Sequence, residues 1–318
     1  VIFMFPYSLD NKLYHTLNYF YKHKFGKKVF KVSLNMGLGC PNKVHGTGCI
    51  FCSNSSGDFA GNPRDNIVTQ FETIKNMMEK KWNDAYYIGY FQAGTNTYAP
   101  LEVLKKNYEA ILTQKNVVGL SIATRSDAIS EDVMDYLEEL NQRTFLTIEL
   151  GLQSIHEKSL TFIRRGHTLE NFTECVKELK RRGISVVVHI INGLPHETKE
   201  DMIETVKYLN DLHINGIKIH MLHILKDTPL ALYYIKHPFH VLTKEEYIDI
   251  VVNQLTYLDP KIVIHRITGD PKKEDLIAPD WLLKKFCVLN DIDKEMKKRD
   301  GVVGHQGQGE AVAGGHLG

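Results

Sequence analysis

Cysteine, net charge and long apolar runs are all scarce in this 318-residue chain. Five cysteines are too few for a disulfide scaffold, and a chain of this length can bury its own core, so we expect a reducing compartment. No apolar run approaches the ~20 residues of a membrane span, and residues 1–6 lack the basic flank of a secretory signal. A net charge of +1 excludes a protein dominated by a basic field. We therefore expect a cytoplasmic protein with no membrane contact, which touches any nucleic acid only through local patches.

Three of the five cysteines, Cys40, Cys49 and Cys52, fall on one short stretch. Thiolates gathered on one loop suit a soft metal centre. Structural zinc would want a fourth ligand, which His45 inside the loop could supply. A cluster of four irons needs one ligand per iron, so three cysteines would leave one iron open for a substrate or cofactor. On this loop alone, zinc and an iron–sulfur cluster are equally favoured.

Short apolar runs alternate with segments of helical period after Lys28. We expect Met77 and Met78, in one such helical segment, to lie in the core. Six strand–helix repeats favour parallel strands with right-handed crossovers, in an open sheet or a barrel. The predicted strands are residues 29–34, 85–91, 117–123, 144–150, 184–191 and 216–224.

The segments around this core differ in character. We expect a helix over residues 8–25, a further strand over 261–267 that extends or caps the sheet, a helix over 243–258 and a last helix from Ala278. Cys175 and Cys287 lack companions and are predicted to be inert small hydrophobes. The predicted parts are an N-terminal helical segment (1–28), the core (29–225), a C-terminal extension (226–300) and a glycine-rich, disordered tail (301–318) that an expression vector could supply.

Parallel barrels carry their chemistry on the loops after the strand carboxyl ends, and these loops are polar here. A single such loop is more often a solvated turn. Glu149, however, interrupts a strand-like run, where burying a carboxylate costs several kcal/mol unless it is satisfied. Six polar loops at one barrel mouth therefore predict a site. Its candidate residues are Gln92, Gly94, Thr95, Arg125, Asp127, Glu149, Gln153, Arg165, His189, His220, His223 and Lys226.

Several motifs together resemble the radical S-adenosylmethionine (SAM) enzymes over residues 29–225. They are the cysteine loop, which begins Gly-Cys-Pro-Asn, then Gly-Leu-Gln-Ser at 151–154, Arg-Gly-His-Thr at 165–168 and Asn-Gly-Leu-Pro-His-Glu-Thr at 192–198. The pattern is similar to the bacterial YhcC/YtqA-type proteins and to the branch that holds the elongator catalytic subunit and the oxygen-independent coproporphyrinogen oxidases. One departure is the eight residues between Cys40 and Cys49, where the superfamily spacing is Cys-x3-Cys-x2-Cys. That departure keeps the zinc alternative open.

The resemblance implies a partial (β/α)6 TIM-like barrel, of the α/β class, with an N-terminal helix and a C-terminal α/β extension. It implies that Cys40, Cys49 and Cys52 hold a 4Fe-4S cluster whose open iron binds SAM. An electron from an external donor such as flavodoxin or ferredoxin would then release a 5'-deoxyadenosyl radical, which abstracts hydrogen from a substrate. The implied SAM contacts are Phe51, Gln92, Gly94, Thr95, Gln153, Arg165, His189, Leu222 and His223.

The substrate side is less defined by the sequence. Arg125, Glu149 and His220 are the candidate substrate-side groups, and Asp127 and Lys226 share the same predicted mouth. Kinship with the elongator branch and basic, aromatic patches at residues 19–28 and 281–298 favour tRNA, at a wobble-uridine side chain, although the near-neutral charge weakens this. A small metabolite is the second candidate.

An alternative of another class is a non-catalytic, zinc-stabilised RNA-binding protein. It would use Cys40, His45, Cys49 and Cys52 as ligands. It would leave Gln153, Arg165 and Gly94 without a function.

Overall fold

The computed structural model describes residues 5–7, 12–53 and 59–299. The predicted disordered tail, residues 301–318, lies outside the described residues. The chain divides into two compact units, which are treated separately below. Unit 1 comprises Val1–Phe20, Gln153–Ile163 and His189–Gly318, and unit 2 comprises Tyr21–Leu152 and Arg164–Val188.

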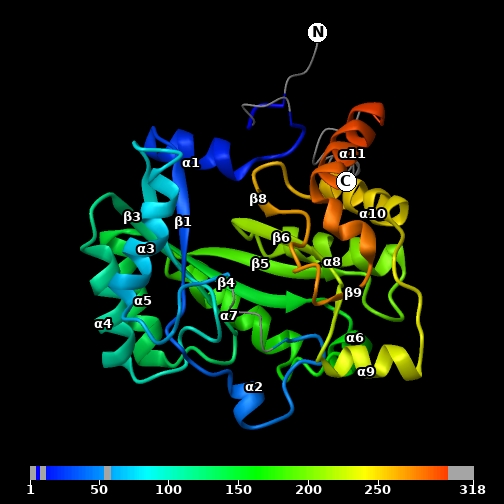
Figure 1. Ribbon diagram of the computed structural model, residues 1–318, viewed down its shortest axis with the longest axis horizontal. Helices are drawn as coiled ribbons and strands as arrows, with labels where there is room; N and C mark the ends of the chain where they lie inside the picture. The colour runs from blue at the N-terminus through cyan, green and yellow to red at the C-terminus, as the bar shows by residue number, and fades with distance from the viewer. Residues whose placement is uncertain (1–4, 8–11, 54–58, 300–318) are drawn as a thin grey trace, which may run out of the picture. The chain divides into compact units, whose positions relative to one another are not determined.

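Seven parallel strands form one sheet in the order β1-β2-β3-β4-β5-β6-β8 (Figure 1). The predicted α/β partial-barrel class is confirmed, and all six predicted core strands are present. The seventh, β8, pairs with β6 and so extends the sheet rather than capping it. The strands are β1 Val29–Leu34, β2 Tyr86–Phe91, β3 Val117–Thr124, β4 Phe145–Gln153, β5 Ser185–Asn192, β6 Gly216–Met221 and β8 Val263–Arg266, with a separate antiparallel pair, β7 Ile224–Leu225 and β9 Leu276–Ala278.

Helices alternate with these strands, and several begin at a capping side chain. Asn66, Thr168, Thr198 and Thr243 each accept a hydrogen bond from a backbone N–H three residues further on, which satisfies a donor that the helix leaves unpaired. None of the described helices is long and apolar enough to cross a membrane. The helices are α1 Leu17–Phe25, α2 Pro41–Val44, α3 Ile67–Glu79, α4 Leu101–Leu112, α5 Glu131–Arg143, α6 Glu157–Phe162, α7 Leu169–Arg181, α8 Lys199–Asp211, α9 Pro229–Lys236, α10 Lys244–Tyr257 and α11 Lys285–Lys298, the last preceded by the 3-10 helix η1 Asp280–Lys284.

In unit 2 the two faces of the sheet differ in chemistry. One face packs against α3 and α4, where Phe71 meets Tyr87 edge to face at 6.0 Å and Tyr108 meets Phe91 at 4.9 Å (Figure 1). Gly89 on this face is in close contact with Ile111 of α4. Side chains alternate between faces along a strand, so the residues between these apolar ones point the other way, where polar groups gather.

The first helix is shorter than predicted. It begins at Leu17, residues 8–11 lie outside the described part, and residues 12–16 are not helical. The reason is a pairing with β8, which also belongs to unit 1: the Ile264 N–H donates to the His15 carbonyl at 2.8 Å, and Thr16 forms a parallel bridge with Ile264. A backbone used in this pairing cannot also form a helix.

Three predictions about single apolar residues have mixed outcomes. Cys175 on α7 is buried, as expected. Met77 is 58% exposed, so its predicted place in the core is wrong, whereas Met78 is half-buried. Cys287, predicted to be an inert small hydrophobe, is exposed. On α11 the buried residues are Val288 and others at helical spacing from it, and Cys287 lies one position off that stripe.

Replacing Gly89 by Ala should destabilise the protein by about 1–3 kcal/mol. The added Cβ would lie 2.4 Å from Ile111 Cγ2 and 3.0 Å from Leu120 Cδ2, so the packed core would have to shift. Urea denaturation measures the loss. The matched control is Gly39→Ala, whose Cβ would lie at an ordinary 3.7 Å from Val44 Cγ2. Equal stability of the two variants would contradict the packing argument.

Candidate functional site

The three clustered cysteines lie on the loop that follows β1. Cys40 stands at the start of the short helix α2, and a turn in which the Cys52 N–H donates to the Cys49 carbonyl at 3.1 Å brings the other two together. All three thiols are free and partly buried. The loop therefore offers three sulfur ligands from one segment, as the sequence predicts.

The Cys49 thiol is buried and interacts electrostatically with the other two cysteines. Its pKa is raised to about 11, mainly by burial and to a smaller extent by the charges of Cys52 and Cys40, against Arg125 and a hydrogen bond from Asn42, which lower it. Metal ligation requires thiolates, so binding would displace protons from this loop. Arg125, which the sequence places on the substrate side, thus lies near the thiols.

The segment after β2 holds the cysteine loop in place. The Thr95 N–H donates to the Gly39 carbonyl at 3.2 Å. Gly94 has φ 78°, and a Cβ there would lie 2.3 Å from the Leu38 carbonyl oxygen, so only glycine fits. Gln92 continues the sheet through its N–H to the Leu34 carbonyl. The structure gives Gly94 and Thr95 a packing task, and their contact with SAM stays a prediction.

The segment between α6 and α7 holds the loop from another direction. Asn42 Nδ2 donates to the Arg164 carbonyl at 2.8 Å and approaches Cys49 Sγ at 3.5 Å. Gly166 has φ 86°, and a Cβ on it would lie 2.4 Å from Asn42 Oδ1. Asn42, which sequence reasoning missed, therefore links a cysteine to this segment.

Two arginines of the predicted site make hydrogen bonds to other residues of unit 2. The buried Arg165 guanidinium donates to the Leu152 carbonyl at 2.7 Å and twice to the His167 carbonyl. Arg125 forms a bidentate pair with Asp127, both contacts at 2.8 Å, and donates to the Arg165 carbonyl. Both side chains order the segment that contacts the cysteine loop, and the predicted contact of Arg165 with a SAM carboxylate is not tested by this geometry.

The four candidate zinc ligands of the loop do not gather as one compact set. His45 Nε2 lies 3.1 Å from the Tyr98 hydroxyl, which supplies it with a hydrogen-bond partner. In the described part of the chain, the ligand atoms of the three cysteines and His45 do not form a group within 4.8 Å of one another. A single zinc ion with Zn–S bonds of about 2.3 Å needs its ligands closer than that. A cluster in which each thiolate binds a different iron suits wider spacing.

Glu149 of β4 is satisfied by three side chains from three other strands. Lys31 Nζ lies 2.7 Å from its carboxylate, the Ser121 hydroxyl donates at 2.7 Å and the Tyr90 hydroxyl at 2.9 Å. The Glu149 side chain is fully buried. The sequence predicts that a carboxylate here must be satisfied, and these contacts give it a structural task, while its substrate role stays a prediction.

Gln153 ends β4 with φ 71°, a left-handed conformation that is rare for a side-chain-bearing residue outside Asn and Asp. Such a conformation costs roughly 1 kcal/mol or more and is often retained at functional sites. The left-handed conformation of Gln153 therefore fits the prediction of a functional site at the carboxyl end of β4. Phe51 is partly buried beside Cys52.

The predicted residues of unit 1 gather around β5 and β6. The rings of His189 and His220 lie 5.3 Å apart. Leu222 is buried, and its N–H donates to the Asn192 carbonyl at 2.8 Å. Lys226 is used elsewhere, since its Nζ donates to the Glu274 carbonyl.

A pocket of about 570 Å³ opens in unit 2 between the loops after β2 and β3. Residues 97–100 and 127–130 line it. Tyr98 links its wall to His45 of the cysteine loop, and Asp127 links it to Arg125. Its volume suits a small molecule or one nucleoside.

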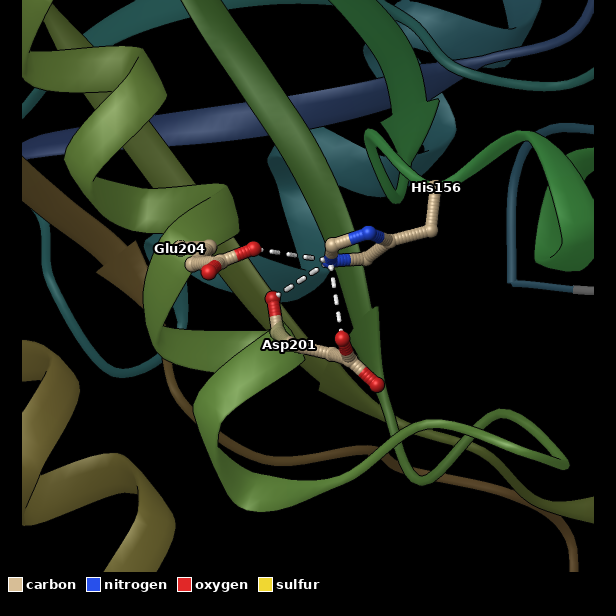
Figure 2. Close-up of side chains that lie close together, drawn as sticks. All are labelled: His156, Asp201 and Glu204. Carbon is tan, nitrogen blue, oxygen red and sulfur yellow. Dashed lines mark hydrogen bonds and ion pairs between the residues drawn. The ribbon is translucent and has the colours of Figure 1, made fainter.

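Figure 2 shows a cluster that sequence reasoning missed: ligand atoms of His156, Asp201 and Glu204 lie within 4.8 Å of one another. The spacing of the two acids, three apart on α8, was the available signal. His156 Nε2 donates to the Asp201 carbonyl at 2.9 Å, and the Asp201 carboxylate accepts from the Thr198 N–H and pairs with Lys158 at 3.3 Å. Because these groups already have partners, the cluster is better explained as a link between α6 and α8 than as a metal site.

The family model of the Radical SAM superfamily matches residues 34–209, and that of the Radical_SAM C-terminal domain matches residues 214–298. The chain thus belongs to the radical SAM superfamily and is one of its enzymes. Membership implies SAM and a 4Fe-4S cluster, and the three cysteines described above fit that donor set.

Individual proteins agree with the predicted resemblance. YtqA of Bacillus subtilis is 50% identical over 93% of each chain, and YhcC of Escherichia coli is 30% identical over 91% of this chain and 92% of that protein. A tRNA uridine(34) acetyltransferase of Methanocaldococcus jannaschii is 29% identical over 48% of this chain and 28% of that protein.

The solved structure of Methanocaldococcus infernus Elp3 with an N-terminal deletion superposes with a TM-score of 0.67. It is 19% identical, and the match covers 87% of this chain and 64% of that one. At that identity the likeness shows the fold alone, and it agrees with the partial barrel.

Replacing Lys31 by Met should lower the free energy of unfolding by about 3 kcal/mol, because it leaves the buried Glu149 carboxylate without its counter-charge. The double variant Lys31→Met/Glu149→Gln should recover part of that loss. Urea denaturation measures both. The control Lys27→Met breaks an exposed pair with Asp84, also 2.7 Å long, and should cost far less. Equal losses from Lys31→Met and Lys27→Met would contradict the argument.

Proposed function

We propose that this enzyme binds a 4Fe-4S cluster through Cys40, Cys49 and Cys52 and modifies tRNA, at the side chain of a wobble uridine. The observation that carries the cluster assignment is the set of three free thiols on one loop, which is held by two neighbouring segments. When bound, the cluster and SAM supply a 5'-deoxyadenosyl radical that removes a hydrogen atom from the substrate.

The chain's own residues prepare this chemistry. Gly94 and Asn42 fix the cysteine loop, and Arg125 places a positive charge near the thiols, which favours their anionic form. Phe51, Gln153 and His189 are the residues that we assign to SAM. The barrel must also exclude water, because a radical attacks whatever is nearest.

The likeness to a tRNA uridine(34) acetyltransferase over about half of this chain supports the tRNA substrate. The basic, aromatic patches support it less. In α1, Lys24 Nζ lies over the Phe145 ring at 4.9 Å, and Lys27, just after α1, pairs with Asp84. On α11, Lys285 pairs with Asp270. Lysines with partners inside the protein contribute less to RNA binding, so recognition must use other groups as well.

A small metabolite is the second candidate substrate. The pocket of about 570 Å³ beside the cysteine loop favours it, because a cavity of that size suits one small molecule.

The cluster assignment is tested by reconstituting the protein with iron and sulfide without air and measuring dithionite-dependent formation of 5'-deoxyadenosine. Wild type should form it and Cys49→Ala should not, with a loss of at least about 100-fold, because one ligand of the cluster is missing. The control Cys287→Ala removes an exposed cysteine outside the loop and should behave as wild type. A colourless protein that binds zinc and cleaves no SAM would overturn the assignment.

The tRNA assignment is tested separately, with unmodified tRNA in the same assay and in a binding titration across a salt series. Affinity for RNA should fall steeply with salt, because cationic side chains release counterions from the phosphates. If affinity is flat with salt and tRNA leaves the rate of SAM cleavage unchanged, the small metabolite becomes the preferred substrate.

A further inference from the structure

Two segments of unit 2 lie side by side at the amino ends of β1 and β2. The strands pair in parallel with Val29 opposite Tyr86, and the Tyr86 N–H donates to the Lys28 carbonyl at 2.9 Å. The end of α1 and the turn after it, residues 22–28, therefore lie beside the turn that leads from α3 into β2, residues 80–84. We call these two segments together the amino-end patch.

The amino-end patch is strongly basic. Its one acidic residue, Asp84, is already neutralised, because Lys27 Nζ lies 2.7 Å from the Asp84 carboxylate. Glu79, which precedes the patch, lies 3.6 Å from Lys75 Nζ. The patch therefore carries a net charge of +5 in a chain whose net charge is +1. Its lysines are Lys22, Lys24, Lys27, Lys28, Lys80 and Lys81.

Three of these lysines hold their charge at the surface. Lys22, Lys80 and Lys81 are exposed, and they form no ion pair with any residue that the structure describes. A lysine in the last turn of a helix stabilises the helix dipole, which explains Lys22 in α1. Lys81 lies beyond the end of α3 and gains less in this way. Like charges on neighbouring segments repel, and an anion on this surface would relieve that repulsion.

Aromatic rings lie between the lysines. Trp82 is 53% exposed, although tryptophan is highly buried on average. Its ring lies 6.1 Å from that of Phe30 on β1, and Lys28 Nζ lies 5.9 Å from the Trp82 ring and 5.6 Å from the Phe30 ring. These contacts order the indole and leave much of it open to solvent. An ordered, exposed indole among ammonium groups suits a nucleobase and its phosphates.

We propose that the amino-end patch binds the sugar–phosphate backbone of RNA, with one unpaired base stacked on Trp82. Lysines pair with phosphates, and an aromatic ring can stack on a base of any sequence. The six residues of β1, about 20 Å of strand, separate the patch from the loop of the three cysteines. The patch therefore holds the RNA outside the nucleotide that reacts. The inference rests on the proposed function, because this RNA is the tRNA assigned there.

The test measures binding of a labelled, unmodified tRNA transcript to the full chain by fluorescence anisotropy across a salt series. Trp82→Ala should weaken binding about tenfold, because one stacked base is lost, and Trp82→Phe should keep most of the affinity. Lys80→Gln/Lys81→Gln should weaken binding and reduce the salt slope by about two, because two phosphates lose their cations. The three side chains are exposed, so the variants should fold.

The matched control removes the same charge elsewhere in unit 2. Lys105→Gln/Lys106→Gln takes two adjacent lysines from α4 and should bind tRNA as wild type. SAM cleavage measured without RNA should be unchanged in all of these variants, because the patch lies at the opposite end of β1 from the cysteines.

A second measurement reports on Trp82 directly. The chain has two tryptophans, so Trp281→Phe leaves Trp82 as the only indole and keeps a ring against Tyr247. A base that stacks on Trp82 should quench its fluorescence. The quenching should saturate at the same tRNA concentration as the anisotropy.

Three results would overturn the patch. They are tRNA binding that Trp82→Ala and Lys80→Gln/Lys81→Gln leave unchanged, Trp82 fluorescence that stays constant as tRNA saturates, and binding to phosphatidylserine vesicles in place of tRNA, which would indicate a membrane surface. The first two remove this inference alone if wild type still binds tRNA. Wild type that binds tRNA through the patch but never cleaves SAM keeps the patch and removes the proposed chemistry.

Discussion

Three thiols can serve one cofactor only if the loop that carries them is held in a single conformation. Ordering each residue of a loop costs roughly 1–2 kcal/mol of backbone entropy, which the loop cannot recover from its own contacts. Here the contacts that offset this entropy cost are made with segments outside the loop. Gly94 brings the segment after β2 against the Leu38 carbonyl, and Asn42 bonds to the Arg164 carbonyl beside Gly166. The two glycines and the asparagine therefore fix the conformation of the loop that carries the three cysteines.

Local patterns were enough to predict most of the fold. Apolar runs located β1 to their exact bounds and the other core strands to within a few residues, because buried parallel strands leave an unbroken signature. The start of α1 could not be predicted in this way. The apolar spacing of Leu13 and Leu17 fits a helix, but the backbone of His15 and Thr16 is paired with β8, at the far end of the chain. This competition between helix formation and pairing with β8 is visible only in the tertiary structure.

The candidate site also has residues that the sequence predicts and residues that only the tertiary structure identifies. The three cysteines and the polar loop ends were visible in the sequence, because they are short patterns with a chemical meaning. The partners of Glu149 were not, since Lys31, Tyr90 and Ser121 come from three strands that are joined only by the sheet.

The bridge between Thr16 and Ile264 also constrains how the chain can fold during synthesis. A segment made early pairs with a strand made late, and contacts of such long sequence separation form slowly. All segments of unit 2 have been synthesised by Val188, whereas unit 1 includes segments from both ends of the chain. His15 and Thr16 therefore leave the ribosome long before Ile264, with which they pair, has been made.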